Sequence, residues 1–311
     1  MVATPVMKIL LVEDSAVDRH NIGSYLKEWH LDYSAVESGT KALKILEGPN
    51  PPTMALLDWL LPGMDGIEIC RRIRARGGNG RYIYTVMLTA KNRKQDLLTA
   101  MAAGADDYLA KPVDASELRA RIMVGKRILD LQQSLSFAAT HDFLTDLLNR
   151  SEIVDALQRE ISRSDREGRP ATVIMADVDH FKQINDTLGH AAGDTVLKEI
   201  AERLKSDLRP YDLAGRYGGE EFLLILPGCD LATGIRRADE IRRLVERNPI
   251  STGCGSRNLT VSMGVTVTPT TRGHSLATIL QQADSALYAA KNNGRNRVEA
   301  FAGARQGASA R

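Results

Sequence analysis

The chain has 311 residues, of which 43% are hydrophobic and 26% are charged, and its formal net charge is +2 at pH 7. This length accommodates two ordinary domains, and this hydrophobic content supports packed cores and excludes wholesale disorder. The near-neutral charge leaves no basic footprint, and no helix-turn-helix pattern is present, so we expect no nucleic-acid partner.

The first part of the chain alternates apolar runs with helical patterns, which is typical of a doubly wound parallel sheet. In such a sheet ligands gather at the carboxyl ends of the strands, so polar residues that follow the runs are expected to converge. Taken singly, each acid is an ordinary strand-end residue, and the prediction depends on the ordered set. The set is Glu13 and Asp14 after 8–12, Asp58 after 54–57, Thr89 after 87–88 and Lys111 after 108–110, with Pro62-Gly63-x-Asp65-Gly66 following Asp58.

This set resembles the receiver domain of response regulators, which has a flavodoxin-like, five-stranded parallel sheet. The resemblance implies that Asp58 accepts a phosphoryl group from a cognate histidine kinase. A carboxylate attacks a phosphoryl anion poorly unless charge is neutralised, a role expected of Mg²⁺ and of Lys111. The resemblance also implies that Mg²⁺ binds to Glu13, Asp14, Asp58 and the Leu60 carbonyl. It implies that the switch residues are Thr89, Tyr108 and Lys111.

The join between the two halves is predicted to be one long helix over residues 116–139, because helix formers dominate there and proline is absent. Leu118 and Ile122 are expected to pack on the receiver sheet. Beyond them a short heptad pattern fits an ordinary amphipathic helix as well as a coiled coil, and its position between two domains favours a coiled coil that aligns two protomers. The heptad residues are Val124, Ile128, Leu131, Leu135 and Ala138.

An apolar run that begins at Thr172 leads into Asp177 and Asp179, which are separated by one residue. Alternate residues of a strand share a face, so these two carboxylates are expected to project together. The chain then turns helical from Phe181, and the free N–H groups at a helix N-terminus favour bound phosphate. Lys182 adds a mobile positive charge. This combination predicts a magnesium–triphosphate site.

The segment Arg216-Tyr217-Gly218-Gly219-Glu220-Glu221-Phe222 joins two apolar strand candidates, 213–217 and 222–226. The two glycines predict a tight β-hairpin whose turn needs residues that are free to take positive φ. Adjacent carboxylates repel each other, which favours a bound cation. Two solvated acids on a hairpin are the other interpretation, and the motif alone does not separate the two.

Several ordered blocks of this half resemble the GGDEF diguanylate cyclases, with Glu in place of Asp at the third motif position. The resemblance implies a ferredoxin-like α+β palm like that of nucleotidyl cyclases. It further implies a bacterial nucleotidyltransferase, controlled by phosphorylation, that condenses two GTP into cyclic di-GMP with loss of pyrophosphate. The blocks are Asp177-x-Asp-x-Phe-Lys-x-x-Asn-Asp186, Gly189-His-x-x-Gly-Asp194, the hairpin segment, Ala283–Asn296, and the opening segment His141–Arg150.

The same resemblance assigns roles to residues of this half. Catalysis is expected from Glu220, Glu221 and Lys182, and Glu220 is expected to lower the pKa of the attacking hydroxyl. Mg²⁺ is expected on Asp177, the Val178 carbonyl, Glu220 and Glu221. A carboxylate accepts from guanine groups that adenine lacks, so guanine is assigned to Asn185 and Asp194. The full GTP set is His180, Phe181, Lys182, Asn185, Asp194, Lys291 and Arg295.

Each cyclase domain would hold one GTP, so the reaction requires a homodimer. Arg209 and Asp212 match the RxxD site at which the product, cyclic di-GMP, inhibits the family; otherwise such a pair is an ordinary surface pair. A second arginine of that site, supplied by the partner, stays open among Arg236, Arg237, Arg242 and Arg243. The alternative function is a catalytically weak GGDEF module that senses GTP or cyclic di-GMP, and the intact acids favour catalysis.

These assignments divide the chain into a receiver at 1–126, a helical linker at 127–140, a cyclase domain at 141–300 and a disordered tail at 301–311. The three cysteines, Cys70, Cys229 and Cys254, are far apart and odd in number, which favours reduced thiols. No apolar stretch approaches the roughly 20 residues that span a bilayer, and residues 1–7 do not resemble a signal peptide. We therefore expect a cytoplasmic protein without membrane insertion.

Overall fold

The computed structural model describes residues 7–75, 82–90, 94–252, 255–268, 275–301 and 303, with the backbone alone at 94–96. The chain divides into two compact units, Met1–Leu135 and Ser136–Arg311. Cys254 and all of the predicted tail except Phe301 and Gly303 lie outside the described residues. Among the described helices, none is long and apolar enough to cross a membrane.

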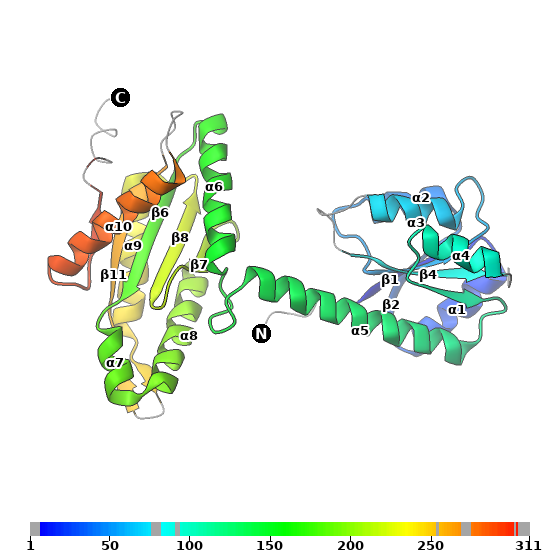
Figure 1. The fold of residues 1–311 in the computed structure, drawn as a ribbon, viewed down its shortest axis with the longest axis horizontal. Helices are drawn as coiled ribbons and strands as arrows, with labels where there is room; N and C mark the ends of the chain where they lie inside the picture. The colour runs from blue at the N-terminus through cyan, green and yellow to red at the C-terminus, as the bar shows by residue number, and fades with distance from the viewer. Residues whose placement is uncertain are drawn as a thin grey trace. The chain divides into compact units, whose positions relative to one another are not determined.

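The first unit is a five-stranded parallel sheet with strand order β2-β1-β3-β4-β5, which confirms the predicted doubly wound fold (Figure 1). Helices α1 and α5 cover one face of the sheet, and α2, α3 and α4 cover the other. The elements are β1 (Lys8–Val12), α1 (Ala16–Glu28), β2 (Asp32–Val36), α2 (Gly39–Leu46), β3 (Met54–Asp58), α3 (Gly66–Ala75), β4 (Tyr84–Thr89), α4 (Lys94–Ala102), β5 (Asp107–Ala110) and α5 (Ala115–Thr140).

The sheet forms because its central strands are apolar throughout. Every residue of β3 and β4 is buried, as expected for parallel strands with helices on both faces. Strand order reverses between β1 and β3, and in open sheets such a switch point leaves a crevice at the carboxyl ends of the strands. The topology therefore places the ends of β1 and β3 side by side.

Helix α5 is 26 residues long, and its first turns pack on the receiver sheet through Leu118 and Ile122, as predicted. Gly125 continues this contact. A Cβ atom there would lie 2.5 Å from Met54 Cε and 2.6 Å from Tyr84 Cδ1, so only glycine lets the helix approach the sheet this closely.

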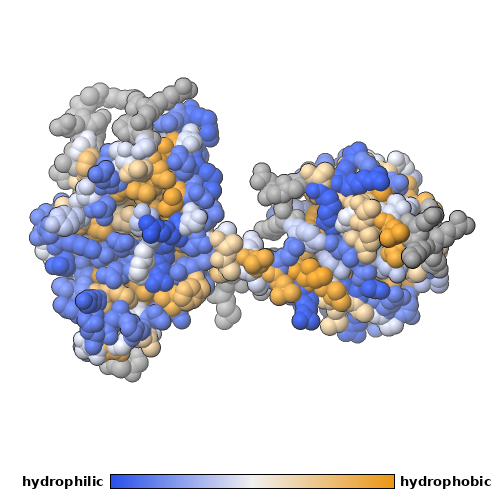
Figure 2. Space-filling model, in the orientation of Figure 1, coloured by the Kyte–Doolittle hydropathy of each residue, from blue (hydrophilic) through white to orange (hydrophobic). Residues whose placement is uncertain are grey.

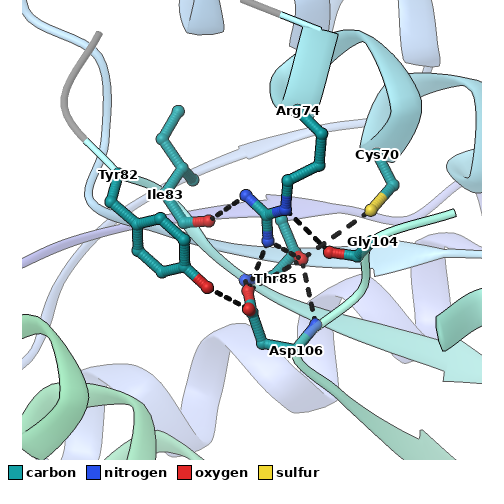
Figure 3. Close-up of polar contacts among 7 residues, drawn as sticks. All are labelled: Cys70, Arg74, Tyr82, Ile83, Thr85, Gly104 and Asp106. Carbon is teal, nitrogen blue, oxygen red and sulfur yellow. Dashed lines mark hydrogen bonds and ion pairs between the residues drawn. The ribbon is translucent and has the colours of Figure 1, made fainter. Parts of the chain in front are cut away.

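A polar network holds the start of β4 against its neighbours (Figure 3). The Arg74 guanidinium at the end of α3 pairs with Asp106 at 2.5 Å, and Asp106 also accepts the Tyr82 hydroxyl. Burial and Asp106 raise the pKa of Tyr82 to about 12. The network ties the last turn of α3 to the start of β4, whereas Thr89 lies at the other end of β4, so we assign the network to stability. Its members are Cys70, Arg74, Tyr82, Ile83, Thr85, Gly104 and Asp106.

The second unit is a mixed five-stranded sheet with strand order β12-β11-β6-β8-β7 (Figure 1). Helices α8 and α9 cover one face, and α6 and α10 cover the other, which is the predicted α+β palm. The elements are α6 (Arg150–Glu167), β6 (Ala171–Val178), α7 (Phe181–Leu188), α8 (His190–Asp207), β7 (Leu213–Arg216), β8 (Glu221–Pro227), α9 (Leu231–Arg247), β9 (Ile250–Thr252), β10 (Gly255–Arg257), β11 (Val261–Val267), α10 (Leu276–Asn292) and β12 (Val298–Ala300).

The predicted hairpin is present as β7 and β8, and the Tyr217 N–H closes it by donating to the Glu221 carbonyl at 2.9 Å. The expectation of positive φ in its turn is wrong, because neither Gly218 nor Gly219 has positive φ. Gly218 is needed for space instead. A Cβ atom there would lie 2.5 Å from Glu221 Oε2, so a larger residue would displace that carboxylate.

Candidate functional site

The structure brings the polar strand ends of the first unit together. Lys111 Nζ lies 2.7 Å from Glu13 Oε2 and 3.0 Å from Asp58 Oδ2. Carboxylate oxygens of Glu13, Asp14 and Asp58 lie within 4.8 Å of one another. Glu13 is fully buried, Asp58 is 5% exposed and Asp14 is exposed, so the group is a shallow acidic site at the carboxyl ends of β1 and β3.

The charges in this site favour a cation. Burial raises the pKa of Glu13, the charge of Asp58 raises it further, and Lys111 opposes both. Burial alone would lower the pKa of Lys111, but its bonds to Glu13 and Asp58 outweigh this effect and raise it. The site holds three carboxylates, and its one ammonium group is shared with a fourth, that of Asp18 at 3.7 Å. Oxygen ligands are those that Mg²⁺ prefers, so the residues fit the predicted metal.

The remaining receiver residues lie on β4, on β5 and in the loop after β3. Thr89 ends β4 and is 5% exposed, and Leu60 lies in the loop two residues after Asp58. Tyr108 is half-buried in β5, with the Arg121 guanidinium of α5 over its ring at 6.0 Å from the centroid. The aromatic ring at the switch position is therefore in contact with the helix that leaves the receiver.

Asp177 of the second unit lies between two strands near the end of β6. Its partners in register are Glu221 on β8 and Ser262 on β11, and the Val178 N–H donates to the Glu220 carbonyl at 3.3 Å. The hairpin thus places both glutamates beside the end of β6. Lys291 of α10 reaches the same place, where its Nζ lies 2.7 Å from Asp177 Oδ2.

The pKa values of Asp177, Glu220 and Glu221 are all raised. Burial is the largest cause for each, the charge of Asp177 adds to the rise for both glutamates, and Lys291 opposes it in all three. Partial burial and mutual repulsion do not fit a pair of freely solvated acids. These three carboxylates carry more negative charge than Lys291 neutralises. Such a set of oxygen donors fits a divalent cation.

Asp179 differs from what the strand pattern predicts. It is 4% exposed and accepts from Ser262 Oγ, from Thr260 Oγ1 and from the Asn296 N–H at 2.7, 2.7 and 3.0 Å. Its oxygens are thus bound by the protein, whereas Asp177 faces Lys291. The two acids do lie close enough for the charge of Asp179 to raise the pKa of Asp177, but only Asp177 pairs with Lys291.

Helix α7 begins at the end of β6, after His180 in the left-handed region with φ of 60°. Phe181 is 7% exposed in the core, so only its backbone can meet a ligand, and Lys182 is exposed. Asn185 is wedged against the start of α8, where a Cβ on Gly193 would lie 2.0 Å from Asn185 Oδ1. Asn185 therefore lies against Gly193, the residue before Asp194 in the chain, and a side chain at position 193 would displace it. The sequence did not reveal this requirement for glycine.

A hollow beside the hairpin continues this site along α10. Glu221 and Lys291 line it, and Arg295 follows α10 with φ of 61°. The charge of Arg295 opposes the rise in the pKa of Asp177, as that of Lys291 does. Other lining residues were not assigned from the sequence, namely Asp284, Ser285, Leu287 and Tyr288.

Arg209 and Asp212 lie in the turn before β7. Asp212 is 8% exposed and accepts from the Arg209 N–H at 3.0 Å, while the Arg209 guanidinium is fully exposed. Arg237 is buried, and its guanidinium lies 3.7 Å from Asp212 and 3.0 Å from Asp207. All four candidate arginines form ion pairs within their own chain, but Arg237 is buried and Arg242 is half-buried, whereas Arg236 and Arg243 are exposed.

Comparisons with known proteins identify both units. The family model for the diguanylate cyclase GGDEF domain matches residues 139–297, and that for the response regulator receiver domain matches residues 9–123. The chain is 34% identical over 301 residues to the response regulator PleD of Caulobacter vibrioides, covering 94% of this chain and 65% of PleD. It is 39% identical over 160 residues to the diguanylate cyclase DosC of Escherichia coli, covering 51% of this chain and 34% of DosC.

Two solved structures share the fold of the second unit. The coiled coil and GGDEF domain of DgcB from Caulobacter crescentus, in complex with c-di-GMP, gives a TM-score of 0.54 at 32% identity, covering 60% of this chain and 97% of that chain. The diguanylate cyclase SiaD from Pseudomonas aeruginosa, in complex with its activator SiaC, gives 0.51 at 39% identity, covering 60% of this chain and 70% of that chain. The chain therefore matches the GGDEF structures over more than half its length.

Proposed function

Because this chain belongs to the GGDEF diguanylate cyclase family and carries a receiver domain ahead of its cyclase domain, we propose that it condenses two GTP into cyclic di-GMP. In each of two transfers a 3′-hydroxyl attacks the α-phosphorus of the other GTP, and pyrophosphate leaves. The observation that carries the proposal is the group of Asp177, Glu220 and Glu221 around Lys291 at the N-terminus of α7.

The residues divide the work between phosphate, base and hydroxyl. Mg²⁺ held by Asp177, the Val178 carbonyl, Glu220 and Glu221 would neutralise triphosphate charge and acidify the attacking hydroxyl. The α7 N-terminus, Lys182, Lys291 and Arg295 bind phosphate oxygens, because free N–H groups and cations favour anions there. The base contacts come from Asn185 and Asp194, and His180 contributes only its backbone.

The direct test is to incubate the purified chain with GTP and Mg²⁺ and to separate the nucleotides by chromatography. Cyclic di-GMP and pyrophosphate should form at one to two, and ATP should give no cyclic dinucleotide. Tight GTP binding without turnover would instead support the sensing module.

We also infer that Asp58 is the phosphorylation site that controls this activity, with Mg²⁺ on Glu13, Asp14, Asp58 and the Leu60 carbonyl. Lys111 is placed to neutralise the transferring phosphoryl group, and Thr89 ends the neighbouring strand, where it can donate to a phosphoryl oxygen. Tyr108 contacts Arg121 of α5, so a rearrangement of the ring would change a contact of that helix. A histidine kinase is the expected phosphodonor.

A homodimer is proposed because each cyclase domain holds one GTP. The predicted heptad residues leave an apolar face on α5 that the described part of the chain does not cover, and hydrophobic residues are visible along this helix in Figure 2. Val124 is 51% exposed, Leu131 is 61% and Leu135 is 71%, while Ile128 is half-buried. Packing this face against the same face of a second copy would remove its apolar side chains from water, which favours association.

Changing Leu131 and Leu135 together to serine is expected to weaken the active dimer. Each leucine that is buried on association contributes about 1.5–3 kcal/mol, so losing two per protomer should raise the dimer dissociation constant by at least about 100-fold. Sedimentation with beryllofluoride measures the dimer, and Gln132→Ser with Gln133→Ser is the control on the same helix. An unchanged dimer fraction in the leucine variant would contradict the coiled-coil assignment.

Product inhibition through Arg209 and Asp212 is proposed from the exposed guanidinium beside a buried, backbone-bound carboxylate. A dimeric product bound there would bridge two domains and hold their active sites apart. Product need only prefer the separated arrangement by a few kcal/mol to suppress most turnover.

Arg209→Ala is expected to relieve inhibition and to leave the initial rate unchanged. The substitution removes the main charge-assisted contact to phosphate or guanine, so affinity for cyclic di-GMP should fall by about 10-fold or more. Calorimetry measures that affinity, and progress curves at high GTP should stay linear longer. Arg166→Ala, an exposed arginine on α6, is the control. If the Arg209 variant stalls as early as wild type, the pair is only a surface contact.

A further inference from the structure

Asp179 joins two segments that are far from it in sequence. It accepts from the side chains of Thr260 and Ser262, which are 81 and 83 residues away, and from the backbone of Asn296, which is 117 residues away. A buried carboxylate without a cation is tolerated only where donors satisfy it, and three do so here. Its own N–H also donates to the Thr260 carbonyl at 2.9 Å, so the residue is held from both sides.

Asn296 is held just as firmly at the other end of this contact. It has φ of 47° and Arg295 has φ of 61°, so two consecutive residues other than glycine lie in the left-handed region. Helix α9 binds both ends of the Asn296 amide, since Oδ1 accepts from Arg242 at 2.7 Å and Nδ2 donates to Glu246 at 2.7 Å. Such backbone persists only where its surroundings determine it. Here Asp179 holds the N–H and α9 holds the side chain.

The two residues flank different parts of the candidate active site. Asp179 directly follows Val178, whose carbonyl is a proposed metal ligand. Asn296 directly follows Arg295, a proposed phosphate ligand. We propose that Asp179 and Asn296 form a brace that keeps the metal-binding end of β6 and the phosphate-binding loop after α10 in register on one triphosphate. Both are positioning residues, and this proposal rests on the proposed function.

The brace fits a positioning role because it acts on backbone. The direction of the Arg295 side chain follows from its left-handed φ, which the neighbouring Asn296 contacts maintain. The Val178 carbonyl direction follows from the turn into α7, which the Asp179 contacts maintain. Without the brace, the Val178 carbonyl and the Arg295 side chain could shift relative to each other. Even small misplacements of binding groups lower the rate of a reaction strongly.

A double-mutant cycle with Asn296→Ala and Arg295→Ala tests whether Asn296 acts through Arg295. The ligand is 3′-deoxy-GTP with Mg²⁺, which lacks the attacking hydroxyl and therefore binds without reacting, and calorimetry gives its dissociation constant. Each single variant should weaken binding about 10-fold, and the double variant should be within about twofold of Arg295→Ala. Additive losses, about 100-fold in the double variant, would overturn the brace.

Asn293→Ala is the matched control for this cycle. It lies in the same loop, and its amide also donates to a carboxylate, that of Glu299 on β12 at 3.1 Å. Among the described residues none of its hydrogen bonds reaches Asp179 or α9. Binding by this variant should stay within about twofold of wild type. A loss equal to that of Asn296→Ala would mean that any change in the loop acts alike, and it would overturn the specific role of Asn296.

Asp179 is tested by comparing alanine with asparagine. Asparagine keeps an oxygen for the Asn296 N–H, and the Ser262 hydroxyl can turn to accept from the new amide. Asp179→Asn should therefore keep kcat/KM within about 10-fold of wild type, whereas Asp179→Ala should lose about 100-fold. Thermal unfolding without metal or nucleotide reports folding separately. If the alanine variant does not fold, Asp179→Asn decides, and a 100-fold loss in a folded Asp179→Asn protein would overturn the brace.

Failure of the brace and failure of the proposed function give different results. A wild-type chain that binds 3′-deoxy-GTP but forms no cyclic di-GMP contradicts the proposed function alone. Additive losses in a wild-type chain that does form cyclic di-GMP contradict the brace alone. Absence of any binding of the magnesium complex by wild type contradicts both.

Discussion

Glu220→Gln is expected to abolish synthesis of cyclic di-GMP while the fold stays intact. Glutamine keeps the size of the side chain but removes the charge that a metal ion requires, at the position where the hairpin meets the end of β6. Loss of one preorganised charge contact typically costs about 100–1,000-fold in rate, and loss of a metal ligand should cost at least as much. The measurement is the initial rate with GTP and Mg²⁺.

The fold should tolerate this change because the hydrogen bonds that close the hairpin do not involve the Glu220 side chain. The Tyr217 N–H donates to the Glu221 carbonyl, and the Arg216 guanidinium donates to the Gly219 carbonyl at 2.7 Å. Glutamine also relieves repulsion with Asp177, so metal-free thermal stability should be equal to that of wild type or higher. Glu202→Gln, an exposed glutamate on α8, is the control. Turnover near the wild-type value in Glu220→Gln would falsify the metal-site assignment.

Asp58→Asn is expected to uncouple the cyclase from phosphodonors. An amide cannot form the acyl phosphate, and it cannot bind beryllofluoride as a carboxylate does, so the ratio of stimulated to unstimulated rate should fall to about one. The geometry behind this expectation is Asp58 at the end of β3, with Lys111 3.0 Å away and the oxygens of Glu13 and Asp14 in reach. The rate is measured with and without beryllofluoride and Mg²⁺.

Asp65→Asn is the matched control for the receiver. Asp65 is an exposed acid in the same loop whose side chain accepts the Glu68 N–H at 2.8 Å at the start of α3, and asparagine is an equally good helix cap. Its stimulation ratio should equal that of wild type. Full stimulation of Asp58→Asn would show that the receiver does not work through Asp58.

The sequence predicted the architecture of both units because their signals are local. Buried parallel strands read as continuous apolar runs, and the polar residue after each run marks the carboxyl end. Residues that are close together in the sequence also stay close together in the fold. Asp177 and Lys182 stay at the turn from β6 into α7, and the two glycines stay in the turn before Glu220.

Only the tertiary structure decided how side chains at these positions are used. Asp177 and Asp179 look alike in sequence, yet one faces Lys291 and the other is saturated by donors up to 117 residues away. Gly218 provides space for Glu221 rather than positive φ. Burial and hydrogen-bond partners are set by register between strands and by packing of distant helices, and neither is encoded in a local spacing. The motifs therefore predicted where the candidate site lies, and the packing of β6, β8, β11 and α10 decided which carboxylate is saturated by the protein's own donors.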